Sequence, residues 1–142
     1  MNKEIIEIVN ILIREGANIN KRDNSGRNAL MYSCLMSDNK DIVKILLKKG
    51  VNINARDEKG DTALMIAALT DKPEIVKSLI NSGSNINTKN SQGETALIKA
   101  KYYYTKNDDN LIKKVLLKDE VVIKDDKLIQ YLINDGAKVN IQ

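Results

Sequence analysis

The segment KGDTALMIA, residues 59–67, occurs in two further versions, SGRNALMYS at residues 25–33 and QGETALIKA at residues 92–100. The three copies begin 34 and then 33 residues apart. Self-similarity at a fixed period of about 20 to 50 residues is typical of proteins built from stacked supersecondary units. The sequence therefore predicts a row of similar units rather than one folded core of mixed elements.

A second string accompanies the first and recurs four times. It is IVNILIREGANIN at residues 8–20, IVKILLKKGVNIN at 42–54, IVKSLINSGSNIN at 75–87 and LIQYLINDGAKVN at 128–140. In each copy the apolar residues lie at helical spacing, and a glycine follows them in the place of a helix C-cap. Each unit is thus expected to contain two helices, one within each of the two strings.

The third unit shows how local chemistry sets these boundaries. Gly60 follows a polar turn, where a residue without Cβ takes positive φ at little cost. Thr62 can then cap a helix that begins at Ala63. Pro73 stands where the first turn of a helix tolerates its missing N–H, and Gly83 is placed to end that helix. The unit is predicted to be a turn followed by two short antiparallel helices.

Such a unit cannot bury its own apolar faces, so only stacking on its neighbours stabilises it. Between units, one asparagine recurs in each loop after the second helix. These asparagines are expected to hydrogen-bond loop backbone, as turn residues do: Asn20, Asn54, Asn87 and Asn140.

The repeated strings resemble those of the ankyrin repeat family, whose unit of about 33 residues opens its first helix with T-P-L-H-x-A. The corresponding tetrapeptides here are Asn28-Ala29-Leu30-Met31, Thr62-Ala63-Leu64-Met65 and Thr95-Ala96-Leu97-Ile98. The Pro and His are missing from every unit, and in the family the His helps to tie neighbouring loops together. The resemblance implies an all-α solenoid of stacked antiparallel helix pairs joined by hairpin turns.

The whole chain, residues 1–142, is interpreted as one such domain. It divides into a half repeat that caps the N-terminal end (1–20), two regular repeats (21–54 and 55–87) and an irregular repeat (88–142). Whether the two ends are natural or belong to a shortened chain is left open.

The irregular repeat holds about 20 additional residues near 101–125. Their apolar residues include a group at helical spacing, which predicts an extra helix that is too apolar to stand alone in water. Two interpretations stay open: the helix caps the end of the stack, or it forms a docking or self-association surface. Otherwise the chain is expected to be a monomer.

Composition excludes most enzymatic chemistry. The 142 residues include no His and one cysteine, Cys34, so neither a His-assisted nucleophile nor a Cys/His metal site can form. No glycine-rich phosphate loop is present. The net charge of +4 arises from 23 basic and 19 acidic residues that alternate along the chain, which does not favour a nucleic-acid partner. We expect a non-enzymatic protein without cofactor, metal or nucleic acid.

No signal peptide and no membrane-spanning segment is recognised in the sequence. The single cysteine fits a reducing compartment. We therefore expect a cytoplasmic protein, with export as an effector left open.

The resemblance also implies a function, because ankyrin repeats usually bind protein partners through turn tips and the exposed face of the first helices, which line a concave groove. Carried over unit by unit, the candidate partner-binding residues are Arg22, Asn24, Ser25, Arg27, Leu35 and Met36; Arg56, Glu58, Lys59, Asp61, Leu69 and Thr70; and Lys89, Ser91, Gln92, Glu94, Tyr102 and Tyr103. The partner is expected to be a protein that the sequence does not identify. The alternative is an architectural spacer or a fragment of a longer array whose binding units lie elsewhere.

Overall fold

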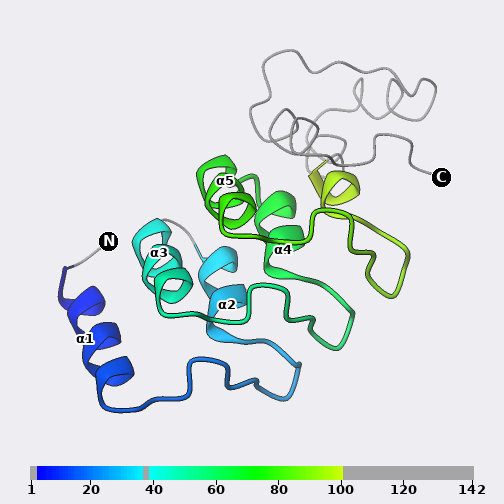
Figure 1. The fold of residues 1–142 in the computed structure, drawn as a ribbon. Helices are drawn as coiled ribbons and strands as arrows, with labels where there is room; N and C mark the ends of the chain where they lie inside the picture. The colour runs from blue at the N-terminus through cyan, green and yellow to red at the C-terminus, as the bar shows by residue number, and fades with distance from the viewer. Residues whose placement is uncertain (1–2, 37–38, 101–142) are drawn as a thin grey trace.

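The computed structural model describes residues 3–36 and 39–100, and this part is helical without any strand. Its helices are α1 (Lys3–Arg14), α2 (Ala29–Leu35), α3 (Lys40–Lys48), α4 (Ala63–Leu69) and α5 (Pro73–Asn81), and residues 96–100 are helical as well (Figure 1). The prediction of an all-α stack is confirmed. The insertion predicted near 101–125, with Tyr102 and Tyr103, lies outside the described residues.

The helices form two rows. One row contains α2 and α4, and the other contains α1, α3 and α5, with each helix packed on its neighbour in the row. Contacts of α2 with α3 and of α4 with α5 join the rows into helix pairs. Long loops between the pairs project to one side as hairpin-like tips (Figure 1). Among the described helices, none combines the length and apolar content that a membrane crossing needs.

Local capping explains where the first helix of each unit begins. The Met31 N–H donates to Asn28 Oδ1 at 3.0 Å, and the Met65 N–H donates to Thr62 Oγ1 at 3.3 Å. Both cap residues have extended backbones, as N-caps do. Pro73 occupies the first turn of α5, so the starts predicted for α4 and α5 are correct.

The core runs continuously through the stack, and α4 lies at its centre. Every residue of α4 from Ala63 to Ala68 is buried. Leu64 and Met65 are among the largest fully buried side chains of the core, and Ala63, Ala67 and Ala68 are buried beside them in the same helix. Met31 and Met65, which stand where the family motif has His, are 0% and 1% exposed, so at these positions the chain uses apolar packing.

Neighbouring loops are tied together by hydrogen bonds. Asn20 Oδ1 accepts the Asn52 N–H at 2.7 Å, and Asn54 Oδ1 accepts the Asn85 N–H at 2.8 Å. The asparagine prediction is confirmed at these two positions, with the added finding that each bond crosses to the next unit. Because each tie joins consecutive loops, the loops form a connected row despite the missing His.

Candidate functional site

The loop tips are each organised by one side chain that accepts two backbone hydrogen bonds. Asp57 Oδ1 accepts the N–H groups of Lys59 and Asp61 at 2.9 and 2.8 Å. Asp23 and Asn90 do the same in the neighbouring tips. Sequence reasoning missed these three residues, although their spacing of 34 and 33 residues repeats that of the glycines. Each tip is therefore a preformed turn and not a loose loop.

Backbone hydrogen bonds also join the tips to one another. The Glu58 N–H donates to the carbonyl oxygen of Ser25, and the Ser91 N–H donates to the carbonyl oxygen of Lys59, both at 3.0 Å. The three tips thus lie side by side in one row. This arrangement brings the candidate residues at the tips of the three units, such as Asn24, Lys59 and Ser91, into one row.

Two candidate arginines serve the scaffold itself. Arg22 Nε donates to the carbonyl oxygen of Gly26 at 3.0 Å, and Arg56 Nε donates to that of Gly60 at 3.2 Å. Arg56 also reaches the next unit, where its Nη2 donates to the carbonyl oxygen of Lys89 at 2.7 Å. Both side chains thus stabilise the loops, a role that the sequence did not predict, and their contact with a partner stays a prediction.

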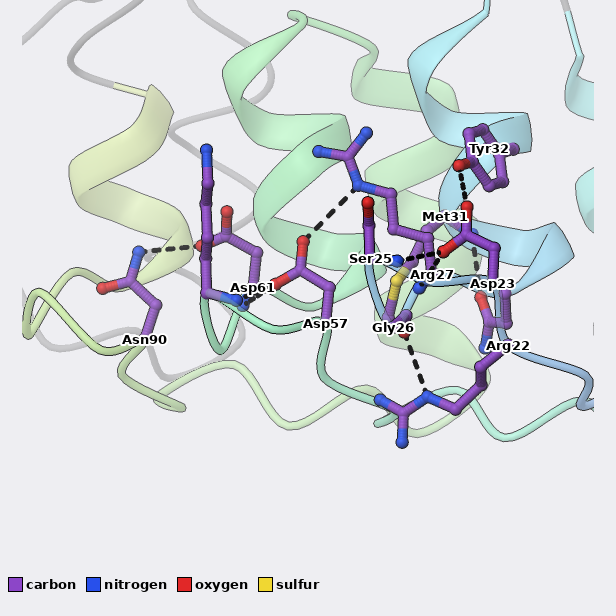
Figure 2. A network of polar contacts seen from close by, with 12 residues as sticks. Arg22, Asp23, Ser25, Gly26, Arg27, Met31, Tyr32, Asp57, Asp61 and Asn90 are labelled. Atoms are coloured by element: carbon purple, nitrogen blue, oxygen red, sulfur yellow. Dashed lines mark hydrogen bonds and ion pairs between the residues drawn. The ribbon is translucent and has the colours of Figure 1, made fainter.

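Arg27 belongs to a polar cluster between the first two tips (Figure 2). Its Nε lies 3.5 Å from Asp57 Oδ2, and its guanidinium carbon lies 6.0 Å from the centre of the Tyr32 ring. The Tyr32 hydroxyl donates to Asp23 Oδ2. This bond, followed by the bond from the Arg27 N–H, lowers the pKa of Asp23 below its ordinary value. Tyr32, 40% exposed on α2, was not among the predicted residues.

Asp61 and Glu94 lie in a second cluster, at the next tip (Figure 2 shows Asn90 and Asp61). Asn90 Nδ2 donates to Asp61 Oδ1 at 2.8 Å and to Glu94 Oε1 at 3.1 Å. Lys99 Nζ pairs with Glu94 at 3.1 Å. Although burial raises the pKa of Glu94, the hydrogen bonds from Asn90 and Lys99 bring it below its ordinary value. Both predicted acids thus take part in contacts within the scaffold.

Four candidate residues lie at the C-terminal ends of α2 and α4, and three of them expose apolar side chains. Leu35, Met36 and Leu69 are 37%, 60% and 42% exposed. The Thr70 hydroxyl instead turns back and donates to the carbonyl oxygen of Ile66 at 2.8 Å. Thr70 is therefore a helix-end residue, while the three apolar side chains stand at the surface as predicted candidates.

Lys72 caps the C-terminal end of α2 with hydrogen bonds, a role that the sequence did not predict. Its Nζ donates to the carbonyl oxygen of Cys34 at 2.7 Å and to that of Met36. Burial lowers the pKa of Lys72. Cys34 itself is enclosed, and burial raises the pKa of its thiol to about 12. Neither group is poised for nucleophilic chemistry, because the amine is engaged and the thiol stays protonated at neutral pH.

Once the scaffold contacts are set apart, the candidates that remain at the surface are polar at the tips and apolar along the first helices. These candidates, together with Tyr32, which the sequence did not predict, are called the tip-and-helix surface. It comprises Asn24, Glu58, Lys59, Lys89, Ser91 and Gln92 at the tips and Tyr32, Leu35, Met36 and Leu69 on α2, its C-cap and α4. Ser25 is half-buried and contributes its carbonyl oxygen to the row.

A family model described as ankyrin repeats (3 copies) matches residues 1–90, the stretch that contains α1 to α5. A search of curated proteins found no match.

Proposed function

The chain belongs to the ankyrin repeat family, and we propose that it is a non-enzymatic module that binds a protein partner through the tip-and-helix surface. Proteins of this family are in general protein–protein interaction modules and are generally not enzymes. The proposal adds the particular surface and the residues that compose it.

The observation that supports it best is the separation between scaffold groups and surface groups. Tip backbones and buried side chains are committed to internal hydrogen bonds, whereas Tyr32, Leu35 and Met36 are exposed. Tyr32 and Leu35 are three residues apart and share one face of α2, and the exposed Met36 follows as the C-cap residue of that helix. An exposed aromatic and apolar face beside polar tips has the composition of an interface centre with a polar rim.

The units also carry different residues at matching surface positions. Asn24, Glu58 and Ser91 occupy the same place in successive tips and are all exposed, and Met36 corresponds to Thr70. The scaffold thus repeats while its outward chemistry changes along the row. A partner that spans several units would meet a different set of contacts in each one, which provides specificity.

The test is affinity capture with the full chain, identification of the captured protein, and measurement of its Kd for two matched double variants. Leu35→Glu with Met36→Glu alters the tip-and-helix surface. Lys44→Glu with Lys48→Glu alters exposed positions of α3, in the other row of helices. We expect the first pair to weaken binding by roughly tenfold or more, as loss of interface hot spots does, and the second to leave it within about twofold.

Loss of binding in the α3 pair with full binding by the α2 pair would place the interface on the second-helix row and refute the proposal. Failure of the full chain to capture any protein would favour the alternative of a spacer. Far-UV circular dichroism of both pairs checks that the stack remains folded.

A further inference from the structure

The loop tips carry charges of both signs, and the fold separates these charges. The tips, taken as residues 21–27, 55–61 and 88–94, contain six basic and five acidic residues. In the sequence the two signs nearly cancel. Contacts within the stack decide which of these charges face water, so the charge of the tip surface differs from that sum.

Most of the acidic side chains at the tips are committed to internal contacts. Asp57 is 7% exposed, and its Oδ2 lies beside the Arg27 guanidinium (Figure 2). Asp61 and Glu94 are half-buried, and both accept hydrogen bonds from Asn90 Nδ2. These three carboxylates stabilise the row of tips and leave little negative charge for a partner to meet.

The other two acidic residues of the tips, Asp23 and Glu58, are exposed. Asp23 Oδ1 accepts the N–H groups of Ser25 and Arg27, and its Oδ2 accepts the Tyr32 hydroxyl. Its carboxylate is therefore engaged within the first unit. Within the three described tips, five exposed basic residues thus stand against one exposed carboxylate that no internal bond engages, that of Glu58.

The exposed basic side chains are arranged in a row. Arg22, Arg56 and Lys89 occupy the same place in successive units and are all exposed. Because backbone hydrogen bonds hold the tips side by side, these cations follow one another along the tips, and Lys59 adds a fourth at the middle tip. We call these four residues the tip cations.

Scaffold bonds hold the two arginines of this row in place without neutralising them. A guanidinium has five N–H donors, of which Arg22 uses one for the carbonyl oxygen of Gly26. Arg56 uses two, for the carbonyl oxygens of Gly60 and Lys89. Both arginines therefore keep their charge and further donors. A carboxylate that meets them forms charge-assisted hydrogen bonds, at a reduced ordering cost because the side chains are already held.

Negative charge for the tip cations has three conceivable sources: the rest of the chain, a nucleic acid and a protein partner. Residues 101–142 contain eight basic and seven acidic residues, so this segment brings no surplus of negative charge. Nucleic acid bases stack on aromatic side chains. The helix part of the tip-and-helix surface offers one aromatic ring, Tyr32, and otherwise the aliphatic side chains Leu35, Met36 and Leu69. This combination suits a protein segment that carries both acidic and apolar residues.

We propose that the protein partner presents an acidic segment, whose Asp or Glu side chains accept hydrogen bonds from the tip cations while its apolar side chains pack on the exposed leucines of α2 and α4. The inference rests on the proposed function and adds to it the chemistry of the partner. Positively charged tips also attract an acidic segment before contact, so association is fast and falls as the salt concentration rises.

The probe for the test is a phage-displayed library of random peptides, selected on the immobilised full chain. Selected peptides are expected to be richer in Asp and Glu than the unselected library and to contain apolar residues. Fluorescence anisotropy then measures the Kd of the selected peptides in solution. Lys59→Glu with Lys89→Glu, at two exposed positions, should weaken their binding by roughly tenfold. Far-UV circular dichroism checks that this variant keeps its helices.

The matched control is Lys44→Glu with Lys48→Glu, which makes the same change in net charge on the other row of helices. It should leave the Kd within about twofold, because charges separated by more than the Debye length of about 8 Å are screened at physiological salt. Equal weakening by the two pairs, or displacement of the peptides by an equal concentration of a random single-stranded oligonucleotide, would overturn the inference.

The composition of the selected peptides separates this inference from the proposed function. Peptides without a surplus of acid, whose binding is still lost in Leu35→Glu with Met36→Glu, would overturn the inference and leave the proposed function standing. Recovery of no peptide at all would count against the proposed function itself, and the inference would fall with it.

Discussion

Gly60 shows how closely neighbouring tips approach one another. Its φ is +78°, and a Cβ there would lie 3.0 Å from the Ser91 backbone nitrogen and 2.8 Å from Arg56 Nη2. Gly50 has a similar φ of +82°, but a Cβ there would meet nothing within 4 Å. The two glycines therefore separate the cost of a left-handed backbone from the cost of crowding between units.

We predict that Gly50→Ala lowers the free energy of unfolding by about 1–2 kcal/mol, the cost of an L-residue in the left-handed region. Gly60→Ala should lower the free energy of unfolding by roughly 1–3 kcal/mol more than Gly50→Ala does, because the added methyl contacts the next tip and displaces Arg56 from Lys89. Urea unfolding monitored by circular dichroism measures both. An equal loss of unfolding free energy in the two variants would mean that the tips can move apart to accommodate the methyl at no cost.

The carboxyl of Asp23 provides a second test at the scale of single residues. The hydrogen bond from the Tyr32 hydroxyl is the largest of the influences that lower its pKa from 3.8. Tyr32→Phe should therefore raise the pKa of Asp23 toward 3.8, and Asp23→Asn should lower the raised pKa of Tyr32 toward 10.0. Carbon-detected NMR titration of each side chain gives both values.

The lowered pKa of Asp23 also determines how the stability of the protein changes with pH. Because the folded state holds the pKa of Asp23 below its unfolded value, the stabilisation is present above pH 3.8 and is lost as the pH falls through the folded pKa. The difference in stability between wild type and Tyr32→Phe should accordingly narrow in acid. An unchanged Asp23 pKa in Tyr32→Phe would show that the hydroxyl does not bond the carboxylate in solution.

At the scale of helices and loops, the contact from Lys72 joins two units that lie far apart in sequence. The ammonium at the start of α5 is bonded to carbonyl oxygens at the end of α2, where helices leave such groups unsatisfied. Lys72→Met keeps most of the stem and removes the charge. We expect a loss of about 1 kcal/mol, below the usual range for bonds to charged groups because the side chain is only half-buried.

Lys44→Met, at an exposed position of α3, is the matched control and should change the free energy of unfolding by no more than about 0.5 kcal/mol. Hydrogen exchange should also locate the effect, since amides at the end of α2 lose protection only in Lys72→Met. Equal stability of the two variants would show that the Lys72 ammonium is solvated and not bonded to α2.

Helices were the part of the fold that the sequence could predict in most detail. The beginnings of α4 and α5 depend on Thr62 and Pro73, which act within a few residues of themselves and can be recognised without tertiary knowledge. Contacts such as those of Lys72 depend on which loops become neighbours across 36 or 38 residues of chain, and no local pattern encodes them. The candidate surface was predictable to the same limited extent. The predicted candidates Leu35 and Leu69 are exposed, whereas the bond from Arg56 to Lys89 was not predicted, because it exists only in the stack.

For the whole molecule, stability should follow position in the stack, because each unit is stabilised mainly by its neighbours. The second position of the repeated thirteen-residue string is a valine in three units: Val9, Val43 and Val76. Val43 and Val76 are 0% exposed, whereas Val9 is only half-buried at the end of the row. One substitution can therefore be compared at the end and in the interior of a single molecule.

We predict that Val43→Ala and Val76→Ala each lower the free energy of unfolding by about 2 kcal/mol, the transfer cost of the lost methyl groups plus the cavity left behind. Val9→Ala should cost less than half of that, since water already reaches α1. Urea unfolding measures the loss of free energy in all three variants, and hydrogen exchange should show α1 opening before α3 and α5. If the three substitutions cost the same, α1 would be as firmly held as the interior helices, and a stack governed by nearest-neighbour contacts would not describe this chain.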